Sequence, residues 1–266
     1  MTPEEHAKAA LDLLDAEKTG KQIGMLTLRH PEMGMDDAYA IQNEIARAKA
    51  AKGRNVVGWK IGLTSKAMQY ALNIDIPDSG ILFDDMVFET GATVPKGRFI
   101  QPRVEAEIAF VLKSPLGGVD VTHADVIAAT DYVTPSIEIL DTRIERVDRA
   151  TGKTRTVFDT ISDNAANAGV VLGKERHSVD AFDLRWVGAI TSRNGEVEET
   201  GLGAGVLNNP VESIVWLARR MAQYGQSIAP GQVILSGSFI RPIECPSGSN
   251  IHADFGTFGR VDISFG

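Results

Sequence analysis

The stretch from residue 101 to residue 112 most strongly limits how this chain can fold. It is rich in apolar and β-branched residues and has prolines near both ends, a pattern that predicts a β-strand. Side chains two residues apart on a strand share a face, so Glu105 and Glu107 point in the same direction. The pattern therefore predicts two carboxylates on a half-buried face of a sheet.

Two neighbouring carboxylates repel each other and lose hydration on burial, and a divalent cation would offset both costs. Glu138 adds a third acid inside the apolar segment from Pro135 to Asp141. Three carboxylates with open positions for substrate and water are typical of a catalytic Mg²⁺ site. The alternative is that these acids face water from edge strands.

Composition narrows the functional classes. The 266 residues suffice for one large domain, or for a large domain with a small one, and the formal net charge is −8. We expect no nucleic-acid partner, because Lys and Arg form no cluster; residues 143–155 mix both signs of charge and indicate a solvated loop. The sole cysteine, Cys245, excludes an intrachain disulfide and is interpreted as structural. No apolar run is long enough for a membrane span and no secretory signal is recognisable, so a cytoplasmic enzyme is expected.

Capping signals and the spacing of apolar residues predict two helices in residues 1–55. Residues 3–18 follow Thr2 as the N-cap, with Pro3 at the first helical position. Residues 36–52 show helical spacing of apolar residues and end at Gly53. We expect residues 1–55 to form a small N-terminal helical cap.

From residue 56 onward, short strands and turns dominate, and helices are expected only at 122–129 and from Asn209 to Tyr224. Asn194-Gly195 is a strong hairpin signal. Because strands and helices alternate poorly, residues 56–266 predict an α+β mixed β body, partly rolled into a barrel. The expected strands are 56–61, 80–82, 86–89, 99–112, 136–141, 169–173, 187–193, 196–201, 233–238 and 260–265.

Further polar residues are candidates for chemistry, each with a simpler alternative. Lys60 lies between two glycines in an apolar strand, which suits a buried active-site lysine or one that reaches solvent from an edge. Asp78 belongs to a turn-rich segment, residues 75–80, and can be only a turn former. His30 and Glu32 share a loop and could activate water on closure, or simply be exposed. The polar residues 159–164 predict a loop that supplies hydrogen-bond donors to a ligand. The simpler alternative is that they cap a neighbouring element.

Taken together, these motifs resemble those of the hydratase and decarboxylase branch of the fumarylacetoacetate hydrolase superfamily. The resemblance runs from about residue 5 to residue 265. The motifs that carry it are Gly58–Met68, Asp78–Gly80, Asp84–Met86, Gln101–Glu107, Glu138–Arg143, Phe158–Ala168 and Gly237–Pro242.

This resemblance implies a fold, a metal and an activity. The fold would be a mixed β-roll of the fumarylacetoacetate hydrolase C-terminal type with a small N-terminal helical part. Glu105, Glu107 and Glu138 would hold Mg²⁺ or Mn²⁺, with Lys60 and Asp78 as the active-site pair. The implied reaction is hydration of a small 2-oxo dicarboxylate. Members of the family form homo-oligomers, often decamers of dimeric units.

The resemblance leaves alternatives open. Loss of CO₂ from a related acid and hydration of a five-carbon acid are the nearest ones; acylpyruvate hydrolysis and a non-catalytic partner subunit are more distant. Ser162 and Ser238 are candidates for substrate binding. Arg241 is the candidate for gripping a distal carboxylate, with Arg29 and Arg143 as rivals.

Overall fold

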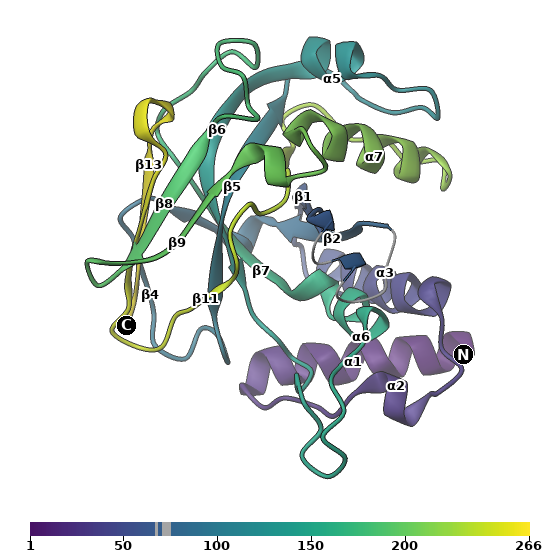
Figure 1. Ribbon diagram of the computed structural model, residues 1–266. Coiled ribbons are helices and arrows are strands. Elements are labelled where there is room, and N and C mark those ends of the chain that lie inside the picture. The colour runs from purple at the N-terminus through teal and green to yellow at the C-terminus, as the bar shows by residue number, and fades with distance from the viewer. Residues whose placement is uncertain (67–68, 71–75) are drawn as a thin grey trace.

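The structure is a computed structural model that describes residues 1–66, 69–70 and 76–266. Residues 67–68, at the end of the Gly58–Met68 motif, and Asp75, the first residue of the expected turn, lie outside the described residues. In Figure 1 the N-terminal helices gather at one end of the molecule, and strands make up most of the remainder.

Capping residues set several helix ends. The hydroxyl of Thr2 accepts a hydrogen bond from the N–H of Glu5, whose carboxylate accepts from the N–H of Thr2, and Gly20 ends the helix in the left-handed conformation. Asn209 caps the start of α7, as the sequence predicts. The helices are α1 Pro3–Thr19, α2 Leu26–Arg29, α3 Met35–Ala51, α5 His123–Ala129, α6 Val157–Ser162 and α7 Pro210–Ala222, with 3₁₀ turns at Asp84–Met86, Asn164–Ala166, Gly203–Gly205 and Gly256–Phe258.

The strands form two mixed sheets. In the larger sheet the order is β2-β1-β10-β5-β6-β7-β3, with β11 also paired to β5, and in the smaller it is β4-β13-β12-β8-β9. The strands are β1 Val56–Gly62, β2 Asp78–Phe83, β3 Val87–Glu89, β4 Thr93–Val94, β5 Arg103–Leu112, β6 Thr130–Leu140, β7 Asn167–Leu172, β8 Gly188–Arg193, β9 Glu196–Leu202, β10 Val233–Leu235, β11 Ile243–Glu244, β12 Asn250–Asp254 and β13 Arg260–Phe265.

The predicted α+β fold with a partly closed β-roll is confirmed. The larger sheet curls, and β13 of the smaller sheet packs against its strands β6 and β7 (Figure 1). The main core lies between them and includes Ile137 and Val171 on one side and Ile251 and Ile263 on the other. The Asn194-Gly195 hairpin joins β8 to β9, with both residues at positive φ, as predicted.

The N-terminal helices have their own core, built around Leu13 and Ile41, but Ile144 and Ile161 from later in the chain complete it. The helices therefore pack directly on the β body, and a division at residue 55 stays a prediction. Within the described part of the chain, no helix is long and apolar enough to cross a membrane.

One expectation is wrong in its local structure. Residues 159–164 were expected to form a loop, but most of them belong to α6 and the 3₁₀ turn after it. The reason is capping, which was the alternative interpretation: the carboxylate of Asp159 accepts hydrogen bonds from the N–H groups of Thr156 and Thr27. These bonds stabilise the start of α6 and tie it to α2.

Candidate metal centre

The pairing of β5 with β6 creates the candidate site. In this antiparallel ladder Glu105 lies opposite Glu138, and Glu107 lies opposite Ser136. Facing residues of neighbouring strands project from the same side of the sheet. Glu105 and Glu107 share one face of β5, as predicted, and Glu138 of β6 projects from the same face of the sheet.

The three carboxylates form a tight, buried cluster. One oxygen from each of Glu105, Glu107 and Glu138 lies within 4.8 Å of the others. Glu107 is 1% exposed and Glu138 is 0% exposed, whereas Glu105 is half-buried at the edge of a cavity. Glu107 accepts a hydrogen bond of 2.7 Å from the N–H of Gly237, just beyond β10. The alternative of a solvated strand face is therefore wrong for Glu107 and Glu138.

Burial raises the pKa of every acid in the cluster, and repulsion from nearby carboxylates adds to each shift. Burial raises the pKa of Glu105, against the opposing charge of Lys60. Burial, with the charges of Glu138 and Glu105 added, raises the pKa of Glu107 well above its usual range. Burial also raises the pKa of Glu138 to about 8, although Lys60 opposes the shift. Without a cation, the site disfavours its own ionised form.

A hard divalent cation fits this donor set. Both carboxylate oxygens of Glu138 are buried, and neither accepts a hydrogen bond from any described N–H or O–H group. Buried carboxylate oxygens without partners are costly, and oxygen ligands of this kind suit Mg²⁺ and Mn²⁺. The residues present therefore match the metal that the sequence predicts.

Lys60 and Asp78 lie beside the glutamates. The Nζ atom of Lys60, on β1, is 3.6 Å from Oε1 of Glu138. Burial lowers the pKa of Lys60, but the charges of Glu138, Asp78 and the other glutamates outweigh burial and leave the pKa raised. Lys60 is 4% exposed, so it is an interior lysine rather than one reaching solvent.

Asp78 belongs to a strand and lines the cavity, so it is not merely a turn former. It begins β2, is 2% exposed, and lies opposite Gly62 of β1. Burial raises its pKa despite the opposing charge of Lys60. Its Oδ1 atom is buried and lacks a hydrogen-bond partner among the residues that the structure describes.

A cavity of about 1040 Å³ opens in front of this cluster. Lys60, Asp78 and Glu105 line the cavity together with apolar residues such as Leu140 and Phe158. A largely apolar cavity with a few convergent charged groups is the usual form of a small-molecule site. The arrangement can hold a metal, bind an anionic ligand and move a proton.

The predicted substrate-binding residues have different positions. Ser238 lines the cavity, but its hydroxyl is engaged in a local turn with the N–H and carbonyl of Ile240. Arg241 also lines the cavity, yet its guanidinium is paired with Glu199 at 2.7 Å and is 82% exposed. Ser162 is fully buried in α6 and does not line the cavity.

His30 and Glu32 do not join the cluster. Neither residue lines the cavity, and the imidazole of His30 lies 3.9 Å from the carboxylate of Glu5 on α1. The rival Arg29 pairs with Asp12, also on α1. The N-terminal loop thus makes local contacts, and a catalytic role for His30 and Glu32 stays a prediction.

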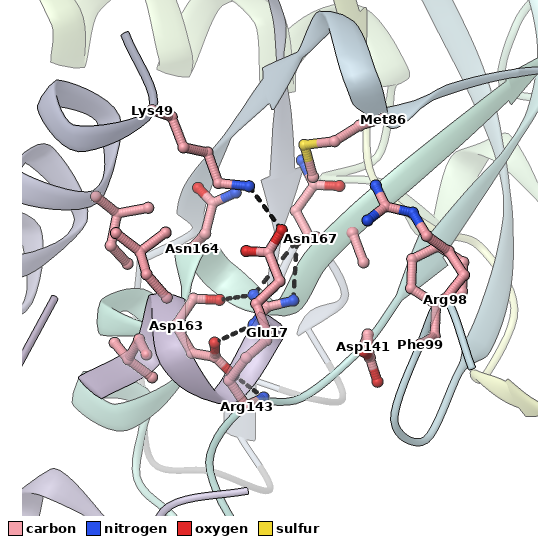
Figure 2. Close-up of a pocket in the computed structure, with 14 residues that line it drawn as sticks. Glu17, Lys49, Met86, Arg98, Phe99, Asp141, Arg143, Asp163, Asn164 and Asn167 are labelled. Atoms are coloured by element: carbon pink, nitrogen blue, oxygen red, sulfur yellow. Dashed lines mark hydrogen bonds and ion pairs between the residues drawn. The ribbon is translucent and has the colours of Figure 1, made fainter. Parts of the chain in front are cut away.

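The other rival, Arg143, belongs to a buried structural network behind the site. Figure 2 shows Arg143 beside Asp163 and, nearby, Lys49 reaching Glu17 of α1. The guanidinium also donates to the backbone carbonyl of Asp163 at 2.6 Å. The expectation of a solvated loop over 143–155 is wrong at its first two residues. Arg143 is 6% exposed because Asp163 compensates its buried charge, and Ile144 belongs to the core of the N-terminal helices.

Sequence reasoning missed two arginines that line the same cavity, Arg103 and Arg155. A signal for Arg103 was present, because it lies two residues before Glu105 on β5 and therefore on the same face. Arg155 gave no such signal, since its place depends on the fold of the long connection between β6 and α6.

Comparison with known proteins places the chain in a family. It is 49% identical over 260 residues to 2-oxo-hept-4-ene-1,7-dioate hydratase of Escherichia coli, which covers 98% of this chain and 97% of that one. It is 41% identical over 265 residues to 2-keto-4-pentenoate hydratase of Paraburkholderia xenovorans strain LB400, covering 100% and 96%. The chain belongs to the hydratase and decarboxylase branch of the fumarylacetoacetate hydrolase superfamily.

A solved structure of this branch has the same fold. 4-Oxalocrotonate decarboxylase from Pseudomonas putida G7, complexed with magnesium and adipate, superposes with a TM-score of 0.94 at 35% identity and covers 100% of this chain and 98% of that one. No family model matches the chain. The resemblance inferred from the motifs is confirmed over nearly the whole sequence.

Proposed function

We propose that the protein is a magnesium-dependent hydratase that adds water to 2-oxohept-4-ene-1,7-dioate and gives 4-hydroxy-2-oxoheptanedioate, a step in the meta-cleavage catabolism of aromatic compounds. The observation that carries the proposal is the buried glutamate cluster beside Lys60 and Asp78. It occurs in a chain that is 49% identical, over nearly its full length, to a hydratase named for that substrate.

In this proposal, Glu105, Glu107 and Glu138 hold Mg²⁺, with Mn²⁺ as the alternative. A relative of the same fold was crystallised with magnesium. When bound, the ion supplies positive charge that favours an oxyanion at the substrate's 2-oxo group. The three glutamates fix the position of the ion, because their carboxylates lie close together in the structure.

The remaining steps follow from Lys60 and Asp78. Lys60 stays protonated at neutral pH because the surrounding carboxylates raise its pKa, so its ammonium stabilises negative charge on the oxygen at C2. Asp78 has a raised pKa and an unengaged Oδ1, so it exchanges the proton at C5 that converts the dienol to the enone. Water then adds at C4. His30 and Glu32 have no part in this scheme, since neither lines the cavity.

The test is turnover by the Asp78→Asn variant. With Mg²⁺ present, loss of dienol absorbance should slow by about 100-fold or more, while calorimetry should find the Mg²⁺ affinity retained. Asp131→Asn, at an exposed position on β6, is the matched control. Full activity in Asp78→Asn would exclude the proton-transfer role.

Decarboxylation, the second candidate reaction, is distinguished from hydration by measuring CO₂ in the same reaction mixtures. The structural match to a decarboxylase favours CO₂ loss as the competing activity, because the same cluster would stabilise the enolate left behind. Hydration of five-, six- and seven-carbon dienols without CO₂ supports the proposal. Release of one CO₂ for each dienol consumed would show that the protein is a decarboxylase and not a hydratase.

We also propose that the protein forms a homo-oligomer of dimeric units, with a decamer as the specific expectation from its family. One chain has a mass of 28.6 kDa. Light scattering of the purified protein gives the assembly mass directly, and a value equal to one chain would contradict the proposal.

A further inference from the structure

Several arginines gather around Arg103, which lies two residues before Glu105 on β5. Arg103 and Arg155 line the cavity, and Arg143 and Arg146 lie close behind them. Burial lowers the pKa of Arg155, and the charges of Arg103, Arg143 and Arg146 lower it further against the opposing charge of Asp163. The guanidinium groups are therefore near enough to repel one another.

Most arginines around this cavity have carboxylate partners. Arg143 pairs with Asp163, and Arg146 pairs with Glu244 at 2.6 Å. Arg241 pairs with Glu199. These three cations are compensated by the protein itself and have little charge to offer a ligand.

Arg103 and Arg155 differ from these three. Among the described residues, no carboxylate lies within ion-pair distance of either guanidinium; the guanidinium of Arg155 donates a hydrogen bond to the hydroxyl of Thr142, at 2.6 Å. Both side chains are half-buried, and both face the cavity. Two partly desolvated, mutually repelling guanidinium groups need an anion, and forked guanidinium donors match a carboxylate.

The position of this pair also suits one end of an extended substrate. Arg103 and Glu105 share a face of β5, with roughly 7 Å between their Cα atoms given the rise of a strand. Arg103 and Glu105 thus line neighbouring parts of the cavity wall, and Arg155 lines the same cavity. Leu140, which lies opposite Arg103 on β6, adds an apolar side chain to the cavity wall, which suits a carbon chain.

We propose that Arg103 and Arg155 form the binding site for the distal carboxylate of the substrate and so determine the preference for a dicarboxylic acid. This inference rests on the proposed function, and it assigns the binding of the distal carboxylate to a pair without an ion-pair partner among the described residues, in place of Arg241. The residues act in substrate recognition and not in the proton transfers.

The first test measures selectivity. Arg103→Met and Arg155→Met should each lower the ratio of kcat/KM for the seven-carbon dienol diacid to kcat/KM for the five-carbon dienol acid by about 10- to 100-fold, the value of a charge-assisted hydrogen bond. Arg241→Met is the matched control and should keep the ratio. An unchanged ratio in both Arg103→Met and Arg155→Met, or a selective loss only in Arg241→Met, would overturn the proposal.

The second test does not depend on turnover. With Mg²⁺ present, calorimetry compares adipate, which has a distal carboxylate, with pentanoate, which does not. The unsubstituted protein should prefer adipate, and Arg155→Met should lose that preference while its melting temperature and assembly mass stay unchanged. If the unsubstituted protein binds adipate selectively but turns over no dienol, the proposed function fails and the anion site stands. Equal binding of both acids, or dissociation of the assembly in Arg155→Met, would refute the anion site.

Discussion

Substituting Gly62 by alanine tests how closely Lys60 and Asp78 must be positioned. A Cβ atom at residue 62 would lie 2.3 Å from Oδ1 of Asp78 and 2.9 Å from Nζ of Lys60, whereas ordinary contact begins at 3.4 Å. Gly62 has no positive φ, so alanine fits its backbone and the effect is steric. The Asp78 carboxylate must therefore move by about 1 Å, a displacement that can cost about 100-fold in rate.

The expected outcome separates catalysis from metal binding. In Gly62→Ala, kcat should fall by about 100-fold, while the Mg²⁺ affinity stays within a few-fold because the glutamates are on β5 and β6. Overpacking costs about 1–3 kcal/mol of unfolding free energy, or a fall of roughly 3–10 °C in melting temperature for a chain of this size.

The control is Gly24→Ala, since a Cβ atom at residue 24 meets no described heavy atom within 4 Å. That variant should keep both rate and melting temperature. A Gly62→Ala enzyme with a rate within about threefold of the unsubstituted protein would refute the reasoning, because it would show that the placement of Asp78 and Lys60 does not limit turnover.

Two further predictions concern the metal and the single cysteine. Mg²⁺ at about 100 times its Kd should add about 2.7 kcal/mol to the unfolding free energy, seen as a rise in melting temperature that a chelator reverses and that Glu138→Gln largely abolishes; an equal rise in that variant would exclude Glu138 as a ligand. Burial raises the pKa of Cys245 to about 12, so at pH 8 its thiolate is about a thousandfold scarcer than that of a free cysteine. A thiol reagent should therefore react with Cys245 quickly only after denaturant is added, and rapid labelling of the folded protein would contradict its buried position.

Local signals in the sequence predicted much of the fold. Thr2 and Asn209 mark helix starts by residue type, and period-two alternation placed Glu105 and Glu107 on one face. Such features depend on near neighbours in the chain. The strand β12, Asn250–Asp254, was missed because it is short and partly polar, and it is held by pairing with β8 and β13 on either side.

The rest of the site depends on contacts between distant residues. Residues 159–164 look like a loop until Thr27, from α2, contributes a partner to Asp159. Likewise, the burial of Arg143 requires Asp163, and nothing near Arg155 in the sequence indicates that it faces the cavity. Tertiary contacts of this kind override local composition.

The alignment of Glu105 with Glu138 across β5 and β6 has a consequence for folding. A slip of one residue between these strands would turn one partner to the opposite side of the sheet, so a misaligned chain would have no complete ligand set. Because the ligands come together only in the native ladder, ion binding favours that ladder over its misaligned competitors. The stoichiometry of tightly bound Mg²⁺ therefore reports the fraction of a refolded sample whose central strands are correctly aligned.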